Sequence, residues 1–432
     1  MYYIYMNNFR GFSHTAIPIH KMNFFVGENS TGKTSVLSLI ELFANPKFWS
    51  DADFNVGSYE FGGYHDIVSA FSKDKSEFQI GLYHCDKNKP DNWVGQLLHF
   101  KDSQSGLATL SRFSAMTQNL IATLEFKGRS LRSYVGPNEA TKISQYIDVF
   151  NYLSKIPSEN FLYSSVKRDD RLVLINSPLR NFWYYIRHEL VDKSRIKFNP
   201  FKFARLPSSY ASIAPIRTRP KRTYDGYTKQ FNSEGEHTPY VIRKNLERRG
   251  KEGKNFKEIL SLFGKESGLF ESISVTNFGK SHDAPFELRI SLEGKSFRVN
   301  SVGYGISQIL PIIVELFSVD SQSSWLAIQQ PEVHLHPKAQ AALGELFFYF
   351  TKDGEETLLV ETHSDYTIDR FRMCMRENQH PERLAQILYF ERSSEGNTIT
   401  SMEISPSGDY PDDQPESFRA FFLTEQRKLL GI

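Results

Sequence analysis

The chain has 432 residues, which is long enough to bury a substantial core and to form two or three domains or one large domain with insertions. Hydrophobic residues at 40% and charged residues at 24% describe an ordinary soluble protein. The net charge of +2 argues against a strongly basic partner surface and an acidic tail, but it neither demands nor excludes nucleic-acid binding, because a local basic stripe can lie on a neutral protein.

Cysteine content and hydropathy indicate the cellular compartment in which the protein works. Cys85 and Cys374 are far apart and have no metal-type spacing, so they indicate neither a disulfide framework nor a zinc ribbon. The N-terminus lacks a basic segment followed by a long apolar one, and no run of about 18 apolar residues occurs in the sequence. We therefore expect a cytoplasmic protein that is neither secreted nor membrane-spanning.

The first predicted elements lead into a phosphate-binding loop. Tyr2–Asn8 alternates around bulky β-forming residues, and Met22–Val26 is an apolar run typical of a buried strand. Val36–Phe43 has the spacing of an amphipathic helix. Between these last two runs, the sequence GENSTGKTS fits the G-x4-G-K-[ST] pattern. A strand before the pattern and a helix after it form the context that the pattern requires, so we expect nucleotide binding.

Each residue type in this loop has a physical role in holding phosphate. Gly27 and Gly32 let the backbone bend so that N–H groups point inward, and the following helix adds its positive dipole end. Lys33 is expected to reach the β- and γ-phosphates, and the hydroxyl of Thr34 to hold magnesium. The predicted cofactors are therefore ATP and Mg²⁺. The residues expected to contact the nucleotide are Gly27, Asn29, Ser30, Thr31, Gly32, Lys33, Thr34 and Ser35.

The middle of the chain changes from strand to helix patterns. Residues 76–135 read as short strands with turns, which predicts a β-rich lobe. Helical spacing then dominates, with predicted helices at Glu139–Ser154 and Leu179–Asp192. A second helical block, Pro239–Phe263, contains the charge run RRGKEGK, which we interpret as a solvated face or a loop. No heptad pattern continues over many turns, so we expect no long coiled-coil arm.

A basic stretch lies between these helical blocks. The short apolar strand Ser212–Ile216 runs into Arg217–Arg222, which contains four cations within six residues. Two interpretations stay open. The stretch binds phosphate, either on the nucleotide or on a nucleic acid, or it is a solvated loop paired with nearby acids.

Sequence patterns typical of phosphate binding occur again in the last third of the chain. Asn300–Gln308 is a polar glycine turn before the apolar helix Ile309–Phe317, which again places free N–H groups at a helix start. The buried strand Trp325–Ile328 runs into Gln329, Gln330 and, two residues later, Glu332. In enzymes that transfer phosphoryl groups, amide or carboxylate groups at a strand end beside a phosphate loop bind magnesium and orient the attacking water.

A third buried strand, Thr357–Val360, ends in the sequence ETHSD. A histidine directly after such a strand lies at the carboxyl edge of a sheet, where ligands of α/β proteins bind. We therefore expect His363 to meet the γ-phosphate rather than to play a purely structural role.

Four motifs together resemble those of ABC-type ATPase heads of the SMC-like and overcoming-lysogenisation-defect group. The similarity extends to bacterial AAA family ATPases of anti-phage defence operons, such as the Septu-type ATPases. It rests on GENSTGKTS as Walker A, SVGYGISQ as signature, IQQPEVHLHP as Walker B and ETHSD as histidine switch, with a weaker likeness at IAPIRTRP. The motifs cover roughly residues 1–65 and 290–375.

The resemblance implies an α/β fold, namely an ABC-type P-loop NTPase head with a mixed β-sheet, a β-lobe and a helical insertion. It divides the chain into residues 1–75 as the N-terminal part of the head, 76–137 as the lobe, 138–285 as the insertion and 286–432 as the C-terminal part. In such families two heads enclose two ATP molecules. The resemblance thus implies a homodimer or higher homo-oligomer in which Ser301 and Gly303 contact the partner's γ-phosphate and His363 senses it.

The chain departs from the family at Gln329 and Gln330, where members commonly carry Asp-Glu. The first acid assists magnesium and the second polarises water. Gln329 would then be a neutral magnesium-site residue, and Gln330 could orient water but could not accept its proton. Either Glu332 becomes the general base or hydrolysis is slow.

The leading functional hypothesis is an ATPase that slowly hydrolyses ATP between two heads and controls a separate effector, most simply a nuclease, in anti-phage defence. The residues after Ser364 contain neither a D-x-D pattern nor a cluster of the H-N-H type, so the effector is expected on another polypeptide. The alternatives are an SMC-like DNA-repair head that clamps DNA and a non-hydrolysing, nucleotide-gated scaffold. Nucleic acid thus remains a possible partner, and no membrane is expected.

Overall fold

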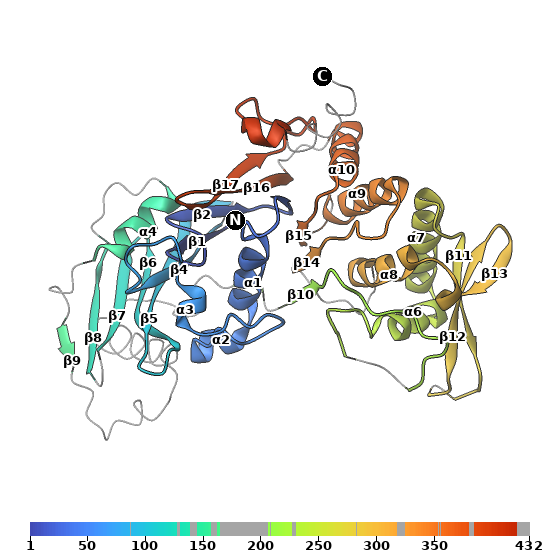
Figure 1. Cartoon of the computed structure of the whole chain (residues 1–432), viewed down its shortest axis with the longest axis horizontal. Helices are drawn as coiled ribbons and strands as arrows, with labels where there is room; N and C mark the ends of the chain where they lie inside the picture. The colour runs from blue at the N-terminus through green and yellow to red at the C-terminus, as the bar shows by residue number, and fades with distance from the viewer. Residues whose placement is uncertain are drawn as a thin grey trace. The chain divides into compact units, whose positions relative to one another are not determined.

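The computed structural model describes residues 1–86, 88–127, 130–138, 145–156, 162–164, 206–207, 209–226, 230–281, 283–317, 325–352, 354, 356–379 and 384–420 (Figure 1). The chain forms two compact units. Unit 1 comprises Met1–His20, Glu28–Ser208 and Phe390–Ile399, and unit 2 comprises Lys21–Gly27, Ser209–Tyr389 and Thr400–Ile432. None of the helices in the described ranges has the length and apolar character needed to cross a bilayer.

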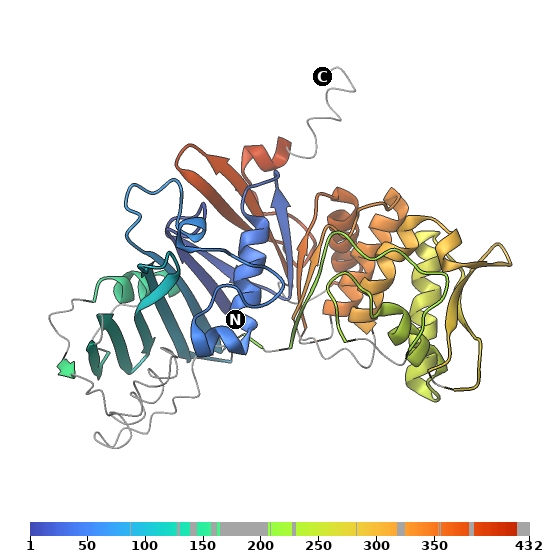
Figure 2. The same cartoon turned by 60° about the horizontal axis from the view of Figure 1, so that its bottom comes forward.

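Unit 1 is built on a sheet that contains eight strands within the described ranges, in the order β2-β1-β4-β5-β6-β7-β8-β9. Neighbouring strands in this sheet pair antiparallel, and Figure 2 shows the blue and teal strands side by side. The strands are β1 (Tyr2–Asn7), β2 (Thr15–Ile19), β4 (Phe78–Asp86), β5 (Lys89–Asp102), β6 (Ala108–Thr117), β7 (Leu120–Lys127), β8 (Ser130–Pro137) and β9 (Leu162–Ser164).

Four helices of unit 1 are described: α1 (Lys33–Ala44), α2 (Pro46–Asp51), α3 (Tyr64–Ile67) and α4 (Tyr146–Ser154). Helix α4 packs on the sheet through Phe150, whose ring stacks on Tyr5 with 4.5 Å between centroids. A Cβ on Gly81 would lie 2.6 Å from Phe150, so glycine lets the helix approach the strand closely. Of the predicted helix Glu139–Ser154, the structure describes the part that forms α4, in which Phe150 is core whereas Tyr152 is 40% exposed.

A six-stranded sheet in the described part of the chain has the order β10-β14-β15-β3-β16-β17, and its first four strands belong to unit 2. The first four strands run parallel. Their bounds are β10 (Tyr210–Ile213), β14 (Trp325–Gln329), β15 (Thr357–Glu361) and β3 (Met22–Gly27), followed by β16 (Ala385–Ser393) and β17 (Gly396–Glu403). A second, antiparallel sheet joins β11 (Ser272–Asn277), β12 (Phe286–Leu292) and β13 (Lys295–Arg298).

The helices of unit 2 that the structure describes are α6 (Thr238–Glu247), α7 (Lys251–Ser267), α8 (Tyr304–Phe317), α9 (Pro337–Thr351) and α10 (Asp365–Asn378). They share one apolar core with β3, β14 and β15, and Figure 1 shows α8, α9 and α10 beside these last two strands. Phe24 of β3 contacts Phe371 of α10 edge to face at 5.4 Å. Buried contacts of this kind fix the strand ends in place.

The predicted α/β class with a mixed sheet and a β-rich lobe is confirmed. The predicted helical block Pro239–Phe263 is two helices, and the chain turns within its charge run, where Gly250 adopts a positive φ of 96° between α6 and α7. The helix predicted at Leu179–Asp192 lies outside the described residues. The four-segment domain division remains a prediction.

Candidate functional site

The phosphate loop begins at Gly27, the last residue of β3, and leads into α1. Gly32 precedes the helix with a φ of 96°, and a Cβ there would lie 2.5 Å from the ring of Phe12. Only glycine fits both the left-handed backbone and this contact. The first turn of α1 contains no acidic residue, and Gly32 supplies no side-chain cap. A helix start of this kind suits an anion.

Lys33 is buried, with 4% of its surface exposed. Its ammonium donates to the carbonyl of Glu28 at 2.7 Å, and the hydroxyl of Thr31 donates to the same carbonyl at 2.8 Å. The loop backbone therefore bends around the ammonium of Lys33, which is the conformation of a phosphate-binding loop. Of the other predicted nucleotide contacts, Asn29 and Ser30 are exposed, whereas Thr34 and Ser35 are half-buried in the first turn of α1.

The structure brings three strand ends of unit 2 together. In the parallel ladder Gln329 of β14 pairs with Glu361 of β15, and Glu361 pairs with Phe25 of β3, two residues before the phosphate loop begins. The prediction that polar residues gather where these strands end thus agrees with the sheet order.

Gln330 follows directly with a φ of 44°, a left-handed conformation that a residue other than glycine rarely adopts. Its backbone N–H donates to the carbonyl of Glu361 at 2.8 Å, which holds the turn in this conformation. Strained backbone of this kind costs about 1 to 3 kcal/mol and is concentrated at functional sites.

Glu332 is held by the residues that directly follow β15. One carboxylate oxygen accepts from the hydroxyl of Thr362 at 2.8 Å, and the other accepts from the backbone N–H of His363 at 2.7 Å. Thr362 is fully buried. Glu332 therefore joins the segment after β14 to the segment after β15, and it positions the backbone of His363.

Arg217, the first cation of the basic stretch, is a buried part of this site with 4% exposure. It donates to the carbonyl of Gln329 at 3.0 Å and makes a long contact of 3.5 Å with the amide oxygen of Gln308 on α8. Burial lowers the pKa of its guanidinium to about 10, while the charge of Glu332 opposes that shift. Arg217 remains a cation at neutral pH and links α8 to the end of β14.

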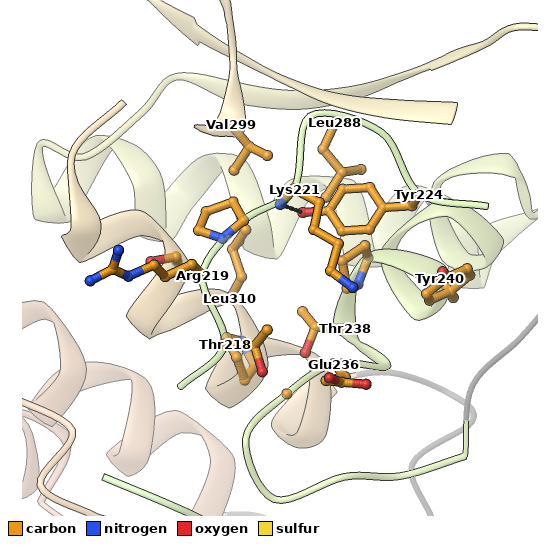
Figure 3. Close-up of a pocket in the computed structure, with 15 residues that line it drawn as sticks. Thr218, Arg219, Lys221, Tyr224, Glu236, Thr238, Tyr240, Leu288, Val299 and Leu310 are labelled. Carbon is orange, nitrogen blue, oxygen red and sulfur yellow. Dashed lines mark hydrogen bonds between the residues drawn. The ribbon is translucent and has the colours of Figure 1, made fainter. Parts of the chain in front are cut away.

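The other cations of the stretch point elsewhere. Arg219 lies over the ring of Tyr304 at 5.3 Å, and Figure 3 shows its guanidinium pointing away from a neighbouring pocket. Lys221 lines that pocket, and its backbone N–H donates to the hydroxyl of Tyr224 at 3.0 Å. Arg222 is exposed. The stretch is therefore not one continuous phosphate-binding surface, although Lys221 and Arg222 remain accessible.

The signature residues lie at the start of α8. Ser301 ends a short 3-10 helix, Val299–Ser301, and is exposed, as is Gly303. A Cβ placed on Gly303 would meet nothing within 4 Å. Tyr304 is 46% exposed and lies 5.8 Å from the ring of His334. This end of α8 is thus open to a partner molecule.

The donors present fit ATP and magnesium. Mg²⁺ prefers oxygen ligands and accepts one or two carboxylates together with phosphate oxygens and water. Unit 1 offers the hydroxyl of Thr34, which the sequence predicts as a ligand. Within unit 2, the amide of Gln329 lies next to the carboxylate of Glu361 in the sheet. Within the described ranges no group of three or more His, Cys, Asp or Glu side chains forms a separate metal site.

Sequence reasoning gave Arg217 only the two open interpretations of the basic stretch, and it gave Glu361 no role. A cation or an acid directly after a buried apolar strand is a usable signal, since such a residue lies at the carboxyl edge of a parallel sheet. The hydrogen bonds of Glu332 could not be foreseen, because they depend on β14 and β15 being neighbours.

Comparison with known proteins gives a family match and several structural likenesses. Residues 1–368 match the family described as AAA ATPase domain. The chain is similar to the SMC head domain from Thermotoga maritima, with 10% identity, a TM-score of 0.41 and coverage of 92% of this chain and 97% of that chain. It is also similar to an SmcHead bound to the C-winged helix domain of ScpA, with 12% identity, a TM-score of 0.44 and coverage of 93% and 97%.

A third similar structure is an Smc head domain with an extended coiled coil, bound to the C-terminal domain of ScpA derived from Pyrococcus furiosus. It has 10% identity and a TM-score of 0.43, with coverage of 99% of this chain and 100% of that chain. No curated protein matches the sequence.

Proposed function

The chain belongs to the AAA ATPase domain family, and from this premise we propose that it is a slow ATP-dependent switch. It binds ATP on the loop Gly27–Ser35, hydrolyses it slowly and uses the long-lived ATP state to control another protein. The slowness, the partner and the roles of individual residues are the content of this proposal.

The observation that carries the proposal is the pair of amide residues at the end of β14. Gln329 and Gln330 stand at the strand end, and an amide cannot accept the proton of water as a carboxylate can. Both oxygens of Glu332, the nearest acid in sequence, accept hydrogen bonds from the histidine-switch segment. Since general base catalysis contributes about 10²- to 10⁴-fold, its loss makes hydrolysis slow.

The residues of the site take the following roles in this proposal. Lys33 and the N–H groups at the start of α1 neutralise the phosphates, and Thr34 supplies a hydroxyl oxygen to magnesium. Magnesium, when bound, stabilises negative charge on the transferring phosphoryl group. Gln330 orients the attacking water, and Glu332 positions His363 to sense the γ-phosphate.

A second copy of the chain completes the nucleotide site. The support is the exposure of Ser301 and Gly303 at the start of α8, where N–H groups are available to an anion from outside. Arg217 contacts both Gln308 on α8 and the carbonyl of Gln329, so it links the signature helix to the end of β14. ATP would therefore hold two heads as a homodimer, and further copies could join them.

The effector is a separate polypeptide, most simply a nuclease, in bacterial anti-phage defence within the cytoplasm. The support is the order of the four motifs, which resembles that of defence ATPases. Affinity capture from the native host with ATP, ADP or no nucleotide tests this assignment. We expect one effector to bind in an ATP-dependent manner, and capture of no neighbouring gene product under any condition would contradict it.

Two other functions make different predictions. A non-hydrolysing, nucleotide-gated scaffold is favoured by the same Gln329–Gln330 pair and predicts tight ATP binding without turnover. An SMC-like head that clamps DNA predicts salt-sensitive duplex binding through the exposed cations Lys221 and Arg222. A filter-binding assay over a range of salt concentrations separates the DNA clamp from both other functions.

ATP turnover by the purified wild-type protein and by Lys33→Ala tests the proposed function. We expect slow phosphate release from the wild type at saturating ATP and none above background from Lys33→Ala, which removes the ammonium that meets the phosphates. Tight binding with no release from the wild type would instead establish the scaffold. Failure to bind ATP would overturn both.

A further inference from the structure

The acid that the Walker B segment lacks is present on the neighbouring strand. Glu361 is the last residue of β15, and in the parallel ladder it is the direct partner of Gln329, which occupies the expected magnesium-assisting position. Its other neighbour is Phe25, two residues before Gly27 begins the phosphate loop. Glu361 thus lies between the strand that leads into the phosphate loop and the strand that carries the glutamines.

The side chains of Gln329 and Glu361 share one face of the sheet. Successive side chains on a strand alternate between the two faces. Leu326 and Ile328 of β14, and Leu358 and Val360 of β15, belong to the large apolar core, as do alternate residues of β3. The intervening residues, which include Gln329 and Glu361, therefore project from the opposite face.

Both side chains are also at the same height on that face. Paired residues on neighbouring strands are separated by about 4.8 Å, and side chains in register stand next to each other. The backbone N–H of Thr362 donates to the carbonyl of Phe25 at 3.1 Å, so the ladder continues just beyond Glu361 and holds it in register with β3. A carboxylate at position 361 can thus reach the same metal ion as a carboxylate at position 329.

Glu361 is also buried, with only 6% of its surface exposed, so its side chain lies within the sheet edge rather than in bulk solvent. Magnesium takes a carboxylate oxygen more readily than an amide oxygen. Of the neighbouring pair Gln329 and Glu361, the acid would therefore be the better magnesium ligand.

We propose that Glu361 is the carboxylate of the magnesium site, in place of an acid at position 329. The carboxylate then lies on β15, one strand away from the usual position, and the end of β14 carries a neutral amide. This inference rests on the proposed ATP-binding function, and it concerns metal affinity rather than the rate of hydrolysis.

Metal-dependent nucleotide binding tests this assignment without relying on turnover. The affinity for a fluorescent ATP analogue is measured by titration with EDTA and with Mg²⁺, and Mn²⁺ binding to the ATP complex is followed by electron paramagnetic resonance. We expect Glu361→Gln to bind the analogue in EDTA as the wild type does, but to lose about 10- to 100-fold in metal affinity. As a matched control, Glu345→Gln removes an acid that pairs with Arg370 on α10 and should leave the metal affinity unchanged.

Returning the charge to β14 provides the decisive comparison. The double variant Gln329→Asp with Glu361→Gln is expected to recover at least about tenfold of the lost metal affinity, because the carboxylate again faces the same space. Unchanged Mn²⁺ affinity in Glu361→Gln, or no recovery in the double variant, would overturn the proposal. If Glu361→Gln does not fold, Glu361→Asp keeps the charge on a shorter side chain and must still weaken metal binding. Failure of the wild type to bind the analogue with or without metal would instead refute the proposed function.

Discussion

Replacement of Glu332 distinguishes a structural clamp from a general base. Its two carboxylate oxygens accept from the hydroxyl of Thr362 and from the backbone N–H of His363. Glu332→Ala removes both acceptors and the negative charge that favours the cationic form of Arg217. Glu332→Gln removes only the charge, since its amide can accept from the N–H of His363 and donate to the hydroxyl of Thr362.

The expected cost follows from these contacts. A buried donor left without an acceptor costs about 1 to 3 kcal/mol, so Glu332→Ala should lose about 3 to 5 kcal/mol once the uncompensated cation is included. A charge-assisted hydrogen bond exceeds a neutral one by about 1 kcal/mol, so Glu332→Gln should lose about 1 to 2 kcal/mol. With about 2 to 4 °C per kcal/mol, these losses correspond to falls in Tm of roughly 10 °C and roughly 4 °C.

Differential scanning calorimetry of the nucleotide-free protein provides the first measurement, and ATP turnover of the same samples provides the second. We expect the order wild type, Glu332→Gln, Glu332→Ala in Tm, with turnover of Glu332→Gln reduced less than about tenfold. If Glu332→Gln kept the wild-type Tm and ATP affinity but lost about a thousandfold in turnover, Glu332 would be the general base and the clamp would be wrong.

Three further predictions concern the loop, the buried arginine and the β-rich unit. Gly32→Ala should abolish ATP binding, because the added Cβ would lie 2.5 Å from the ring of Phe12. The control Gly226→Ala also has a positive φ, of 93°, but its Cβ would meet nothing within 4 Å, so it should retain ATP binding. Equal ATP affinities of the two variants in calorimetry would contradict this prediction. Arg217→Met should lower stability to urea by about 2 to 3 kcal/mol and weaken ATP binding, whereas the exposed Arg222→Met should change stability by less than about 0.5 kcal/mol. Equal midpoints for these two variants would refute a role for Arg217. A hydrogen bond from His99 lowers the pKa of Glu77 from 4.5 to about 2, so Glu77 stabilises the fold above pH 4.5 and this contribution disappears as the pH falls toward 2. The Tm difference between wild type and Glu77→Gln should shrink over that range, and a difference that stayed constant would argue against the shift.

The parts of the site that sequence reasoning could predict are those set by local chemistry. A strand, a glycine loop with Lys33 and Thr34, and a helix form a continuous segment, so their geometry follows from neighbours in the chain. The strands before Gln329 and His363 could be recognised in the same way, because an apolar run of this length with polar residues at its end has few alternatives.

The remaining features depend on pairings between distant segments. That Glu361 stands beside Gln329 follows from the order of the strands, which no local pattern specifies. The basic stretch illustrates the same limit. Its composition left a phosphate site and a solvated loop open, and the structure shows Arg217 buried and Arg219 over an aromatic ring. The left-handed φ of Gln330 could not be read from its residue type, which disfavours that conformation.

The central claim is that an amide stands where a general base would act, so that the ATP state is long-lived. The most direct test is single-turnover cleavage of the γ-phosphate by the purified chain alone, compared between wild type and Gln330→Glu. We predict a wild-type rate below about one per second and an increase of at least about tenfold when the carboxylate is introduced. A wild-type rate on the order of tens per second without any partner, together with no gain in Gln330→Glu, would contradict the account.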